Sequence, residues 1–363
     1  MRFPEFTGEW EKKQLQEECS FFSGGTPSSS NKEYYDGDIP FIRSGEIDAQ
    51  HTELFLTQKG YNNSSAKMVE IGDLLLALYG ATSGEIAINK IHGAINQAIL
   101  CIRSPYNNVF VKSIWKKHVL HILQTYLQGG QGNLSADIVK KLSFYFPSNR
   151  EQDKISEFVA LVDQRIETQN KIIEDLRLLI LGVNKRLFYN YNSTEYVQLG
   201  EIATITNGAN DVQDANLEYT DGLYPFYDRS ETIKFLDTYF LDKEAIIYPG
   251  EGSEFFPRYH NGKFALHQRC YAIYDVREEY VVKYLYYYMQ NLNNYFIRNA
   301  VGSTVSSLRL DTFKRVRIPI LSKIEQTKIC NVLDSLSNKL QIEQNCLSKY
   351  QSQKQYLLQQ MFI

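Results

Sequence analysis

The side chains with the clearest potential for chemistry lie on glycine-containing loops, yet no loop has the spacing of a known catalytic motif. Gly80–Gly84 lacks both the lysine and the spacing of a phosphate-binding loop. Gly250–Gly252 lacks the third glycine of a dinucleotide-binding loop. The sequence also has no Gly-x-Ser-x-Gly, His-Glu-x-x-His or Asn/Asp-Pro-Pro-aromatic motif. It therefore predicts a chain that binds and positions other molecules, with no catalytic residues and no metal site of its own.

Basic residues are grouped in segments that contain no Asp or Glu, although the formal net charge of the chain is −3. Residues 86–136 form a 51-residue stretch without an acid, which carries five Lys or Arg residues and three His residues. The second half has two shorter stretches of this kind, Phe255–Tyr274 and Tyr280–Leu310. Such segments favour two surfaces that contact phosphates. The alternative is that the acids simply gather in other parts of each half.

Side chains that can make paired hydrogen bonds to base edges are present on loops of both halves. In the first half the candidates are Arg43, Ser44, Lys67, Ser83, Asn96, Gln97, Gln131 and Asn133. In the second half they are Tyr227, Arg229, Arg258, Tyr259, Lys263, His267, Gln268, Ser303, Thr304 and Arg309. Gln97 matches Gln268 in position, and Arg43 matches Arg229 with an offset of one residue. These matches are either base contacts or shared structural residues of a duplicated fold.

The elements that must position these loops include a 38-residue segment that occurs twice, at Glu151–Phe188 and at Glu325–Phe362. Each copy has an apolar residue every seven positions and a second apolar series four residues further on, which predicts two long helices paired as a coiled coil. The residues assigned to helix pairing are Ile155, Val162, Gln169, Leu176, Val183, Ile329, Leu336, Glu343, Tyr350 and Leu357. Gln169 and Glu343 interrupt the apolar series, and we expect them to contact each other.

Each helical segment follows a domain of similar size, so the sequence indicates a duplicated unit. Short apolar runs separated by glycines predict strands in both domains, and helices are expected at Val111–Leu127 and Tyr280–Asn299. The predicted fold class is α+β, with two mixed α/β recognition domains joined by two long helices that pair as an antiparallel coiled coil. The predicted parts are a first recognition domain at 1–149, a central helix at 150–190, a second recognition domain at 191–323 and a C-terminal helix at 324–363.

Cysteine usage and hydropathy indicate a compartment for the chain. The five cysteines are scattered and form no Cys-x-x-Cys pair, which is typical of reduced cytoplasmic thiols. No apolar run is long enough to span a membrane, and the first residues lack the apolar core of a secretory signal. We therefore expect a cytoplasmic protein without a membrane partner.

Several motifs together carry a resemblance to a known family. The twin openings Glu151-Gln-Asp-Lys-Ile155 and Glu325-Gln-Thr-Lys-Ile329 each begin a long helix. Asn133-Leu-Ser and Pro147 precede the first of them, and the chain opens with Phe6-Thr-Gly-Glu-Trp-Glu-Lys-Lys. With these features the chain resembles, over essentially its whole length, the specificity (S) subunit of type I restriction–modification systems.

The resemblance implies a function for each part of the chain. Each recognition domain is expected to read half of a split, asymmetric site in double-stranded DNA, while the helices act as a spacer and dock two modification subunits. Those methyltransferase partners bind S-adenosylmethionine and methylate adenine, and separate restriction or translocase subunits use ATP and Mg. The chain itself is expected to bind none of these cofactors. The two loops that differ between the halves, Gly24-Gly25 against Asn207-Gly208 and Gly129–Gly132 against Gly302-Ser303, fit an asymmetric site.

Two other interpretations remain open at this stage. The first is a non-catalytic coiled-coil scaffold whose basic domains bind RNA or acidic protein partners. The second is an enzyme with an unfamiliar active site, which the motif search disfavours. Copurification with an adenine methyltransferase distinguishes the specificity subunit from the scaffold.

Overall fold

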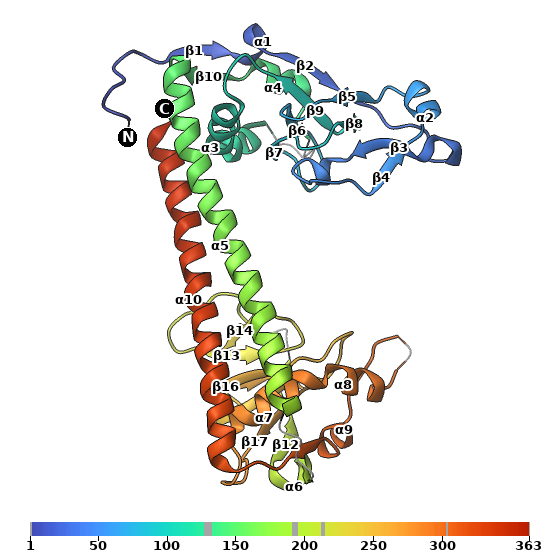
Figure 1. The fold of residues 1–363 in the computed structure, drawn as a ribbon, viewed down its shortest axis with the longest axis vertical. Coiled ribbons are helices and arrows are strands. Elements are labelled where there is room, and N and C mark those ends of the chain that lie inside the picture. The colour runs from blue at the N-terminus through green and yellow to red at the C-terminus, as the bar shows by residue number, and fades with distance from the viewer. Residues whose placement is uncertain (1, 127–132, 191–194, 212–214, 303, 363) are drawn as a thin grey trace. The chain divides into compact units, whose positions relative to one another are not determined.

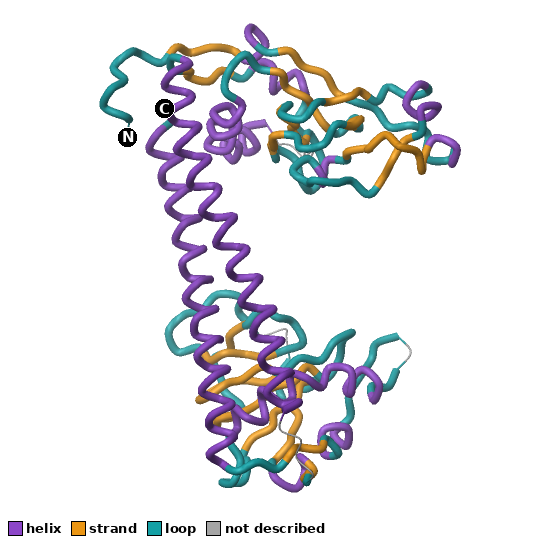
Figure 2. Tube along the Cα trace, in the orientation of Figure 1, coloured by secondary structure: helices purple, strands orange, loops and turns teal. Residues whose placement is uncertain are grey.

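A computed structural model describes residues 2–126, 133–190, 195–211, 215–302 and 304–362. The chain forms two compact units. Unit 1 comprises residues 1–170 and 346–363, and unit 2 comprises residues 171–345. Each unit contains part of both long helices, α5 (Asn149–Asn190) and α10 (Lys323–Met361), which Figure 2 shows without a break. None of the described helices combines the length and the apolar character that crossing a membrane requires. All five cysteines are free thiols.

Unit 1 contains a four-stranded sheet in the order β2-β9-β6-β7, a second sheet in the order β4-β3-β8-β5 and a β1-β10 pair (Figure 1). Its strands are β1 (Glu11–Gln14), β2 (Ser20–Ser23), β3 (Tyr35–Ile42), β4 (Leu54–Leu56), β5 (Lys67–Val69), β6 (Leu74–Ala77), β7 (Ile86–Ile88), β8 (Gly93–Ile95), β9 (Ile99–Arg103) and β10 (Ser143–Phe146). Its other helices are α1 (Leu15–Glu18), η1 (Lys32–Tyr34), η2 (Ser44–Glu46), α2 (Gln58–Asn62), α3 (Asn108–Tyr126) and α4 (Ala136–Lys141).

Strand β6 explains why the core of unit 1 has two layers. All four of its residues are buried, because both faces of its sheet are covered. Leu74 and Leu76 lie in a cluster with the α3 residue Trp115, whereas Leu75 lies in a second cluster with Ile95 of the other sheet. A strand buried on both faces reads as a continuous apolar run rather than an alternating one. The run Leu74–Ala77 is therefore the sequence feature that anchors the domain.

Unit 2 contains a six-stranded sheet in the order β12-β17-β15-β16-β13-β14 and a β11-β18 pair. Its strands are β11 (Tyr196–Gln198), β12 (Thr204–Asn207), β13 (Tyr224–Tyr227), β14 (Lys234–Leu236), β15 (Leu241–Pro249), β16 (Arg258–Leu266), β17 (Cys270–Tyr274) and β18 (Arg317–Pro319). Its other helices are α6 (Leu199–Ile202), α7 (Val282–Met289), η4 (Gln290–Leu292), α8 (Asn293–Asn299) and α9 (Leu310–Lys314). Strand β15 takes the place of β6, since Ile246 and Ile247 again point into two different clusters.

The helix predicted at Tyr280–Asn299 is interrupted in the structure. It consists of α7 and α8 with the 3-10 turn η4 between them. The amide of Asn184, a buried residue of α5, donates hydrogen bonds to the Tyr287 carbonyl (3.1 Å) and to the Gln290 side chain (3.0 Å). The Tyr287 carbonyl is the acceptor that the N–H of Asn291 would use in a regular helix. A tertiary contact from a residue distant in sequence therefore accompanies the break, which explains why local periodicity missed it.

Within each unit the segments of α5 and α10 run in opposite directions. In unit 1, Ile155 near the start of α5 shares a core with Met361 at the end of α10, and Asp163 forms an ion pair with Lys354. In unit 2, Leu187 near the end of α5 packs on the cluster that contains Ile329 near the start of α10. The predicted fold class, with mixed α/β domains and antiparallel long helices, is confirmed.

The burial pattern along both helices follows the seven-residue repeat. All ten residues assigned to helix pairing are buried or half-buried, and Gln169 is buried although it is polar. Gln169 belongs to unit 1 and Glu343 to unit 2. Their predicted contact with each other therefore stays a prediction.

Candidate nucleic-acid interface

A parallel pair of strands positions the loops that carry the candidate residues. In unit 1, β3 and β8 run parallel, with Ile42 opposite Ile95. In unit 2, β13 and the end of β16 are paired in the same way, with Tyr227 opposite Leu266. Parallel strands end at the same edge of a sheet, so the two loops that follow them begin side by side. The strand pairing therefore places the loop after β3 next to the loop after β8, and the loop after β13 next to the loop after β16.

The loops after β8 and β16 are matched turns, residues 96–98 and residues 267–269. The Asn96 side chain accepts a hydrogen bond from the N–H two residues further along the chain (3.1 Å), and His267 does the same through Nδ1 (3.2 Å). The N–H groups of Asn96 and His267 donate in turn to the carbonyl at the end of the parallel strand, at 3.3 and 2.9 Å. Gln97 and Gln268 therefore occupy the middle of two turns with the same backbone hydrogen bonds.

A glycine packs against each matched turn. A Cβ atom at Gly24 would lie 1.8 Å from the Ile95 carbonyl oxygen, and one at Gly208 would lie 2.2 Å from the Leu266 carbonyl oxygen. Atoms cannot approach so closely, so both positions require glycine for close backbone contact. The structure matches Gly24 with Gly208, and the second glycine of the Gly24-Gly25 pair corresponds to Ala209.

The strand register agrees with the one-residue offset predicted between Arg43 and Arg229. Arg43 follows Ile42 directly, and the residue that follows Tyr227 is Asp228. Arg43 is therefore the structural counterpart of Asp228, and Arg229 stands one position further along. The sequence match reflected two similar residue types rather than one shared structural position.

Arg43 pairs with two acids within unit 1. Its guanidinium donates to Glu46 (3.0 and 3.1 Å) and to Glu53 (2.6 Å), and its pKa is raised by these hydrogen bonds. Burial alone would raise the pKa of Glu46, but hydrogen bonds from Arg43, from two backbone N–H groups and from Thr52 lower it to about 2. The two carboxylates hold Nε and Nη2 of the guanidinium and so fix the side chain against its own loop. Arg43 is a structural anchor of the loop after β3.

The other candidates of unit 1 are dispersed. Gln97 accepts a hydrogen bond from the Thr26 hydroxyl, and the Ser83 hydroxyl donates to the Leu78 carbonyl (2.9 Å). Ser83 also lines a cavity of about 430 Å³ together with Lys116, whose pKa is lowered by burial and by neighbouring lysines. The remaining candidates are Ser44, half-buried at the start of η2, Lys67, exposed on β5, and Asn133, exposed before α4. Gln131 lies outside the described residues.

In unit 2 a buried carboxylate organises the loop after β13. Asp228 is 3% exposed and accepts hydrogen bonds from the Ser230 N–H (2.7 Å) and from Lys234 Nζ (2.6 Å). Burial would raise the pKa of Asp228, but the hydrogen bonds from Lys234 and Ser230 lower it below the ordinary value. Arg258 donates to the Asp228 and Ser230 carbonyls and lies 4.9 Å from the centroid of the Tyr227 ring. Arg258, packed on the Tyr227 ring, therefore holds the backbone of the loop after β13 in place.

Most other candidates of unit 2 also have internal partners. The Tyr259 hydroxyl donates to Glu244 (2.6 Å), and its pKa is raised by burial and by that carboxylate. Lys263 Nζ lies over the rings of Tyr224 and Tyr239, 5.7 and 4.8 Å from their centroids. Two further described candidates, Thr304 and Arg309, are exposed. Ser303 lies outside the described residues.

One cavity brings three of the predicted residues together. Its volume is about 480 Å³, and its lining includes Arg229, His267 and Gln268. The other residues in the lining are Asp211, Asp228, Ser230, Lys234, Glu251 and Arg269. None of these six was among the residues predicted from the sequence to contact bases. Asp228 and Ser230 could have been predicted as site residues, because they flank Arg229 in the sequence.

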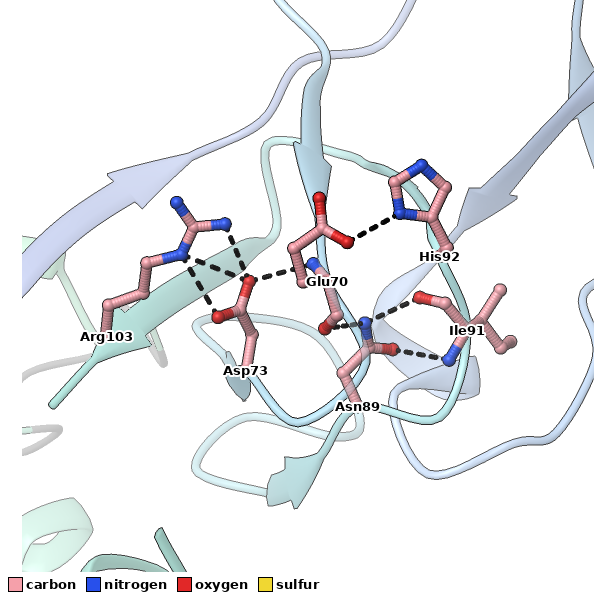
Figure 3. A network of polar contacts seen from close by, with 6 residues as sticks. All are labelled: Glu70, Asp73, Asn89, Ile91, His92 and Arg103. Atoms are coloured by element: carbon pink, nitrogen blue, oxygen red, sulfur yellow. Dashed lines mark hydrogen bonds and ion pairs between the residues drawn. The ribbon is translucent and has the colours of Figure 1, made fainter. Parts of the chain in front are cut away.

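Side chains of the acid-free segment of unit 1 pair with acids from outside the segment. Figure 3 shows Arg103 bound to Asp73 at 2.9–3.2 Å and His92 bound to Glu70 at 2.8 Å. The same network contains Asn89, whose side-chain amide donates hydrogen bonds to the carbonyls of Glu70 and Ile91. Burial would raise the pKa of Asp73, but Arg103 and a backbone N–H lower it. The acids come from residues before the segment, so a lack of acids along the sequence does not measure free positive charge.

Comparison with known proteins identifies the family. The family model described as Type I restriction modification DNA specificity domain matches residues 7–178 and 192–349. The type I restriction enzyme EcoDI specificity subunit of Escherichia coli is 31% identical over 155 residues, which are 41% of this chain and 33% of that subunit. The MjaIX specificity subunit of Methanocaldococcus jannaschii is 25% identical over 233 residues, which are 56% and 53% of the two chains. The matched regions thus span 33% and 53% of these curated relatives.

Solved structures share the fold. The S subunit of a type I restriction–modification system from M. genitalium gives a TM-score of 0.61 at 17% identity, covering 100% of this chain and 99% of that one. A chain from a structure of a type I R-M system, described in terms of complex assembly and conformational transition, gives 0.60 at 16% identity and covers 98% and 97%. The chain belongs to the family of type I restriction–modification DNA specificity domains, and it carries two copies of the domain.

Proposed function

We propose that the chain is the DNA-binding specificity subunit of a type I restriction–modification complex and recognises a bipartite, asymmetric sequence in double-stranded DNA. The observation that carries this proposal is the pair of matched turns, one in each unit, each packed on a glycine and placed beside the loop of a parallel strand. A duplicated loop scaffold on two domains of a DNA specificity family is suited to reading two half-sites. Hydrogen-bonding side chains on these loops would contact base edges.

The asymmetry of the site would follow from the chemistry of the two turns. In unit 1 the exposed Gln97 side chain accepts a hydrogen bond from Thr26, whereas in unit 2 the exposed Gln268 side chain has no partner among the described residues. The loop after the parallel strand begins with Arg43 in unit 1 and with Asp228 in unit 2. Two loops with the same backbone and different side chains would recognise different bases.

The chain would position catalytic partners rather than react itself. We propose that two modification subunits dock on it, bind S-adenosylmethionine and methylate adenine at N6, and that restriction subunits bind ATP and Mg and cleave DNA. The complex would act in the cytoplasm. In unit 2, α5 exposes Leu178, Leu179 and Leu181, with 60%, 50% and 53% of their surface accessible. These leucines lie outside the heptad positions, and exposed apolar side chains of this kind are suited to contact with a partner protein.

The test is to coexpress the chain with its modification subunits and map methylated adenines in host DNA. The proposal predicts a stable complex and a split motif with two specified half-sites. Replacing residues 11–146 with the corresponding domain of another family member should change one half-site and leave the other intact. The proposal is wrong if the complex methylates DNA without a split motif, or if the exchange leaves both half-sites unchanged.

A further inference from the structure

The middle residue of the matched turn is in a different state in each unit. Gln97 accepts a hydrogen bond from Thr26, which follows the Gly24-Gly25 pair. Thr26 corresponds to Asn210 in unit 2. The side-chain oxygen of Asn210 is buried without a hydrogen-bond partner among the described residues. The Gln268 side chain is exposed and has no partner in the described part of the chain. Both hydrogen-bonding groups of the Gln268 amide are therefore available for a ligand.

The second available group is the guanidinium of Arg229. Arg229 is exposed, and no hydrogen bond or ion pair joins its side chain to a described residue. The backbone on both sides of it is fixed, because Arg258 binds the carbonyls of Asp228 and Ser230 and the Ser230 N–H binds the Asp228 carboxylate. Because the backbone is already fixed, only the Arg229 side chain has to become ordered when it binds a ligand.

The cavity lining carries three acidic and three basic side chains, and Arg229 is one of the basic ones. In the lining of the cavity, Asp228 is paired with Lys234 (2.6 Å) and Glu251 with Arg269 (2.8 Å). The third acid of the lining, Asp211, also has a partner. Arg229 makes no ion pair with a described carboxylate, so its guanidinium N–H groups can donate to a ligand. Its ligand should be an acceptor of hydrogen bonds rather than a donor.

We propose that Arg229 and Gln268 are specificity-determining residues of the second recognition domain, with Arg229 reading a guanine and Gln268 an adenine in the same half-site. Arginine offers two parallel donors that match O6 and N7 of guanine, and a glutamine amide offers a donor and an acceptor that match N6 and N7 of adenine. Both residues line one cavity at the edge where the parallel strands end. This inference rests on the proposed function, since it names the bases that one domain would read.

The experiment is selection of bound duplexes from a randomised DNA library by the full chain in complex with its modification subunits. The variants are Arg229→Ala, Arg229→Lys and Gln268→Ala. Arg277→Ala is the matched control, because Arg277 is an exposed arginine of unit 2 outside the cavity. Lysine keeps the charge but lacks the fork that binds guanine in two places.

The wild-type complex should enrich a split motif with a guanine and an adenine in one half-site. Both Arg229 variants should reduce the preference for that guanine by about tenfold to a hundredfold, and Gln268→Ala should relax the adenine, with the other half-site unchanged. The control should enrich the wild-type motif. An unchanged motif in Arg229→Ala, or a uniform loss of binding that Arg229→Lys restores, overturns the inference while the proposed function stands. If the wild-type complex enriches no split motif, the proposed function fails and this inference fails with it.

Discussion

Arg43 and Asp228 occupy the same position at the end of a parallel strand in their respective units, yet they carry opposite charges. Each anchors the loop that follows through an ion pair, Arg43 with Glu46 and Glu53 and Asp228 with Lys234. Both units thus have an ion pair at this position, but the residue at the strand end is basic in unit 1 and acidic in unit 2. In each unit one acid of the ion pairs is largely buried, Glu46 at 14% and Asp228 at 4% side-chain exposure, and either order of charges at this position provides such a pair.

The first prediction concerns Arg43→Ala in unit 1. The Glu46 side chain is 14% exposed, so removing its cation leaves a carboxylate poorly hydrated and should lower the free energy of unfolding of unit 1 by about 2 kcal/mol. Both tryptophans of the chain, Trp10 and Trp115, lie in the core of unit 1, so tryptophan fluorescence during urea unfolding reports this unit. Lys59→Met is the control, because its pair with Glu33 is exposed on both sides and should contribute little.

The same anchor predicts a pH dependence. The pKa of Glu46 is about 2 in the folded chain and 4.5 ordinarily, so its charged form is favoured by folding. Its contribution to stability is therefore complete above pH 4.5 and is lost as the pH falls toward 2. In Glu46→Gln, the fluorescence-detected stability should decline less between pH 4.5 and 2 than in the wild type. Parallel declines in the two proteins would contradict the assignment of Glu46 as a stabilising anion.

The second prediction concerns Lys234→Met in unit 2. Asp228 is 3% exposed, and loss of its cation should destabilise the loop after β13 by about 3 kcal/mol. Hydrogen–deuterium exchange of residues 224–236 should then accelerate while exchange in unit 1 is unchanged. The control Lys243→Met breaks a pair with Asp275 in which both side chains are about half exposed, and it should change exchange by no more than about 1 kcal/mol. Equal effects of the two substitutions would show that Asp228 does not organise the loop.

The long helices could be predicted because their pattern is local and repeated. The seven-residue apolar series identified both helices, and α5 and α10 begin at Asn149 and Lys323, each next to a proline-containing strand end. The pattern also predicted that Gln169 would face inward with the apolar positions, and it is buried. Periodicity succeeds here because one face of a helix must repeat at the helical period.

The candidate site was less predictable because its contacts join segments that no pattern connects. The pairing of Arg43 with Glu53 depends on the path of the chain between them, and the hydrogen bond from Thr26 to Gln97 joins residues 71 positions apart. Strand register places Arg43 and Asp228 at the same position, in agreement with the one-residue offset between Arg43 and Arg229 in the sequence. Sequence comparison of the two halves could find similar residue types, but it could not show which arginine is free.

The third prediction concerns Gly182→Ala in α5. Gly182 is within a helix, and a Cβ atom there would meet nothing within 4 Å. Alanine lowers the entropy of the unfolded chain and favours the helix, so the substitution should stabilise the isolated chain by about 0.5–1 kcal/mol. Urea unfolding monitored by circular dichroism at the helical band would show the higher midpoint. If stability falls, the surface around Gly182 must be closely packed in solution.

The fourth prediction tests whether the matched turns depend on their glycines. Gly24→Ala would place a Cβ atom 1.8 Å from the Ile95 carbonyl oxygen, and Gly208→Ala would place one 2.2 Å from the Leu266 carbonyl oxygen. These neighbours are backbone atoms of sheet residues, so the turn must move, and we expect each unit to lose more than about 2 kcal/mol of stability locally. Gly45→Ala is the control, since a Cβ atom at that position meets nothing within 4 Å.

The two glycine variants should also separate the half-sites. Each displaces only its own matched turn, so Gly24→Ala should impair DNA selection at the half-site read by the first domain, and Gly208→Ala at the half-site read by the second. Hydrogen–deuterium exchange confined to residues 95–99 or 266–270 would show that the rest of the chain is folded. If both variants select the wild-type motif at both half-sites, base reading must occur on other loops, since a turn displaced from its sheet cannot hold its central glutamine in the same place.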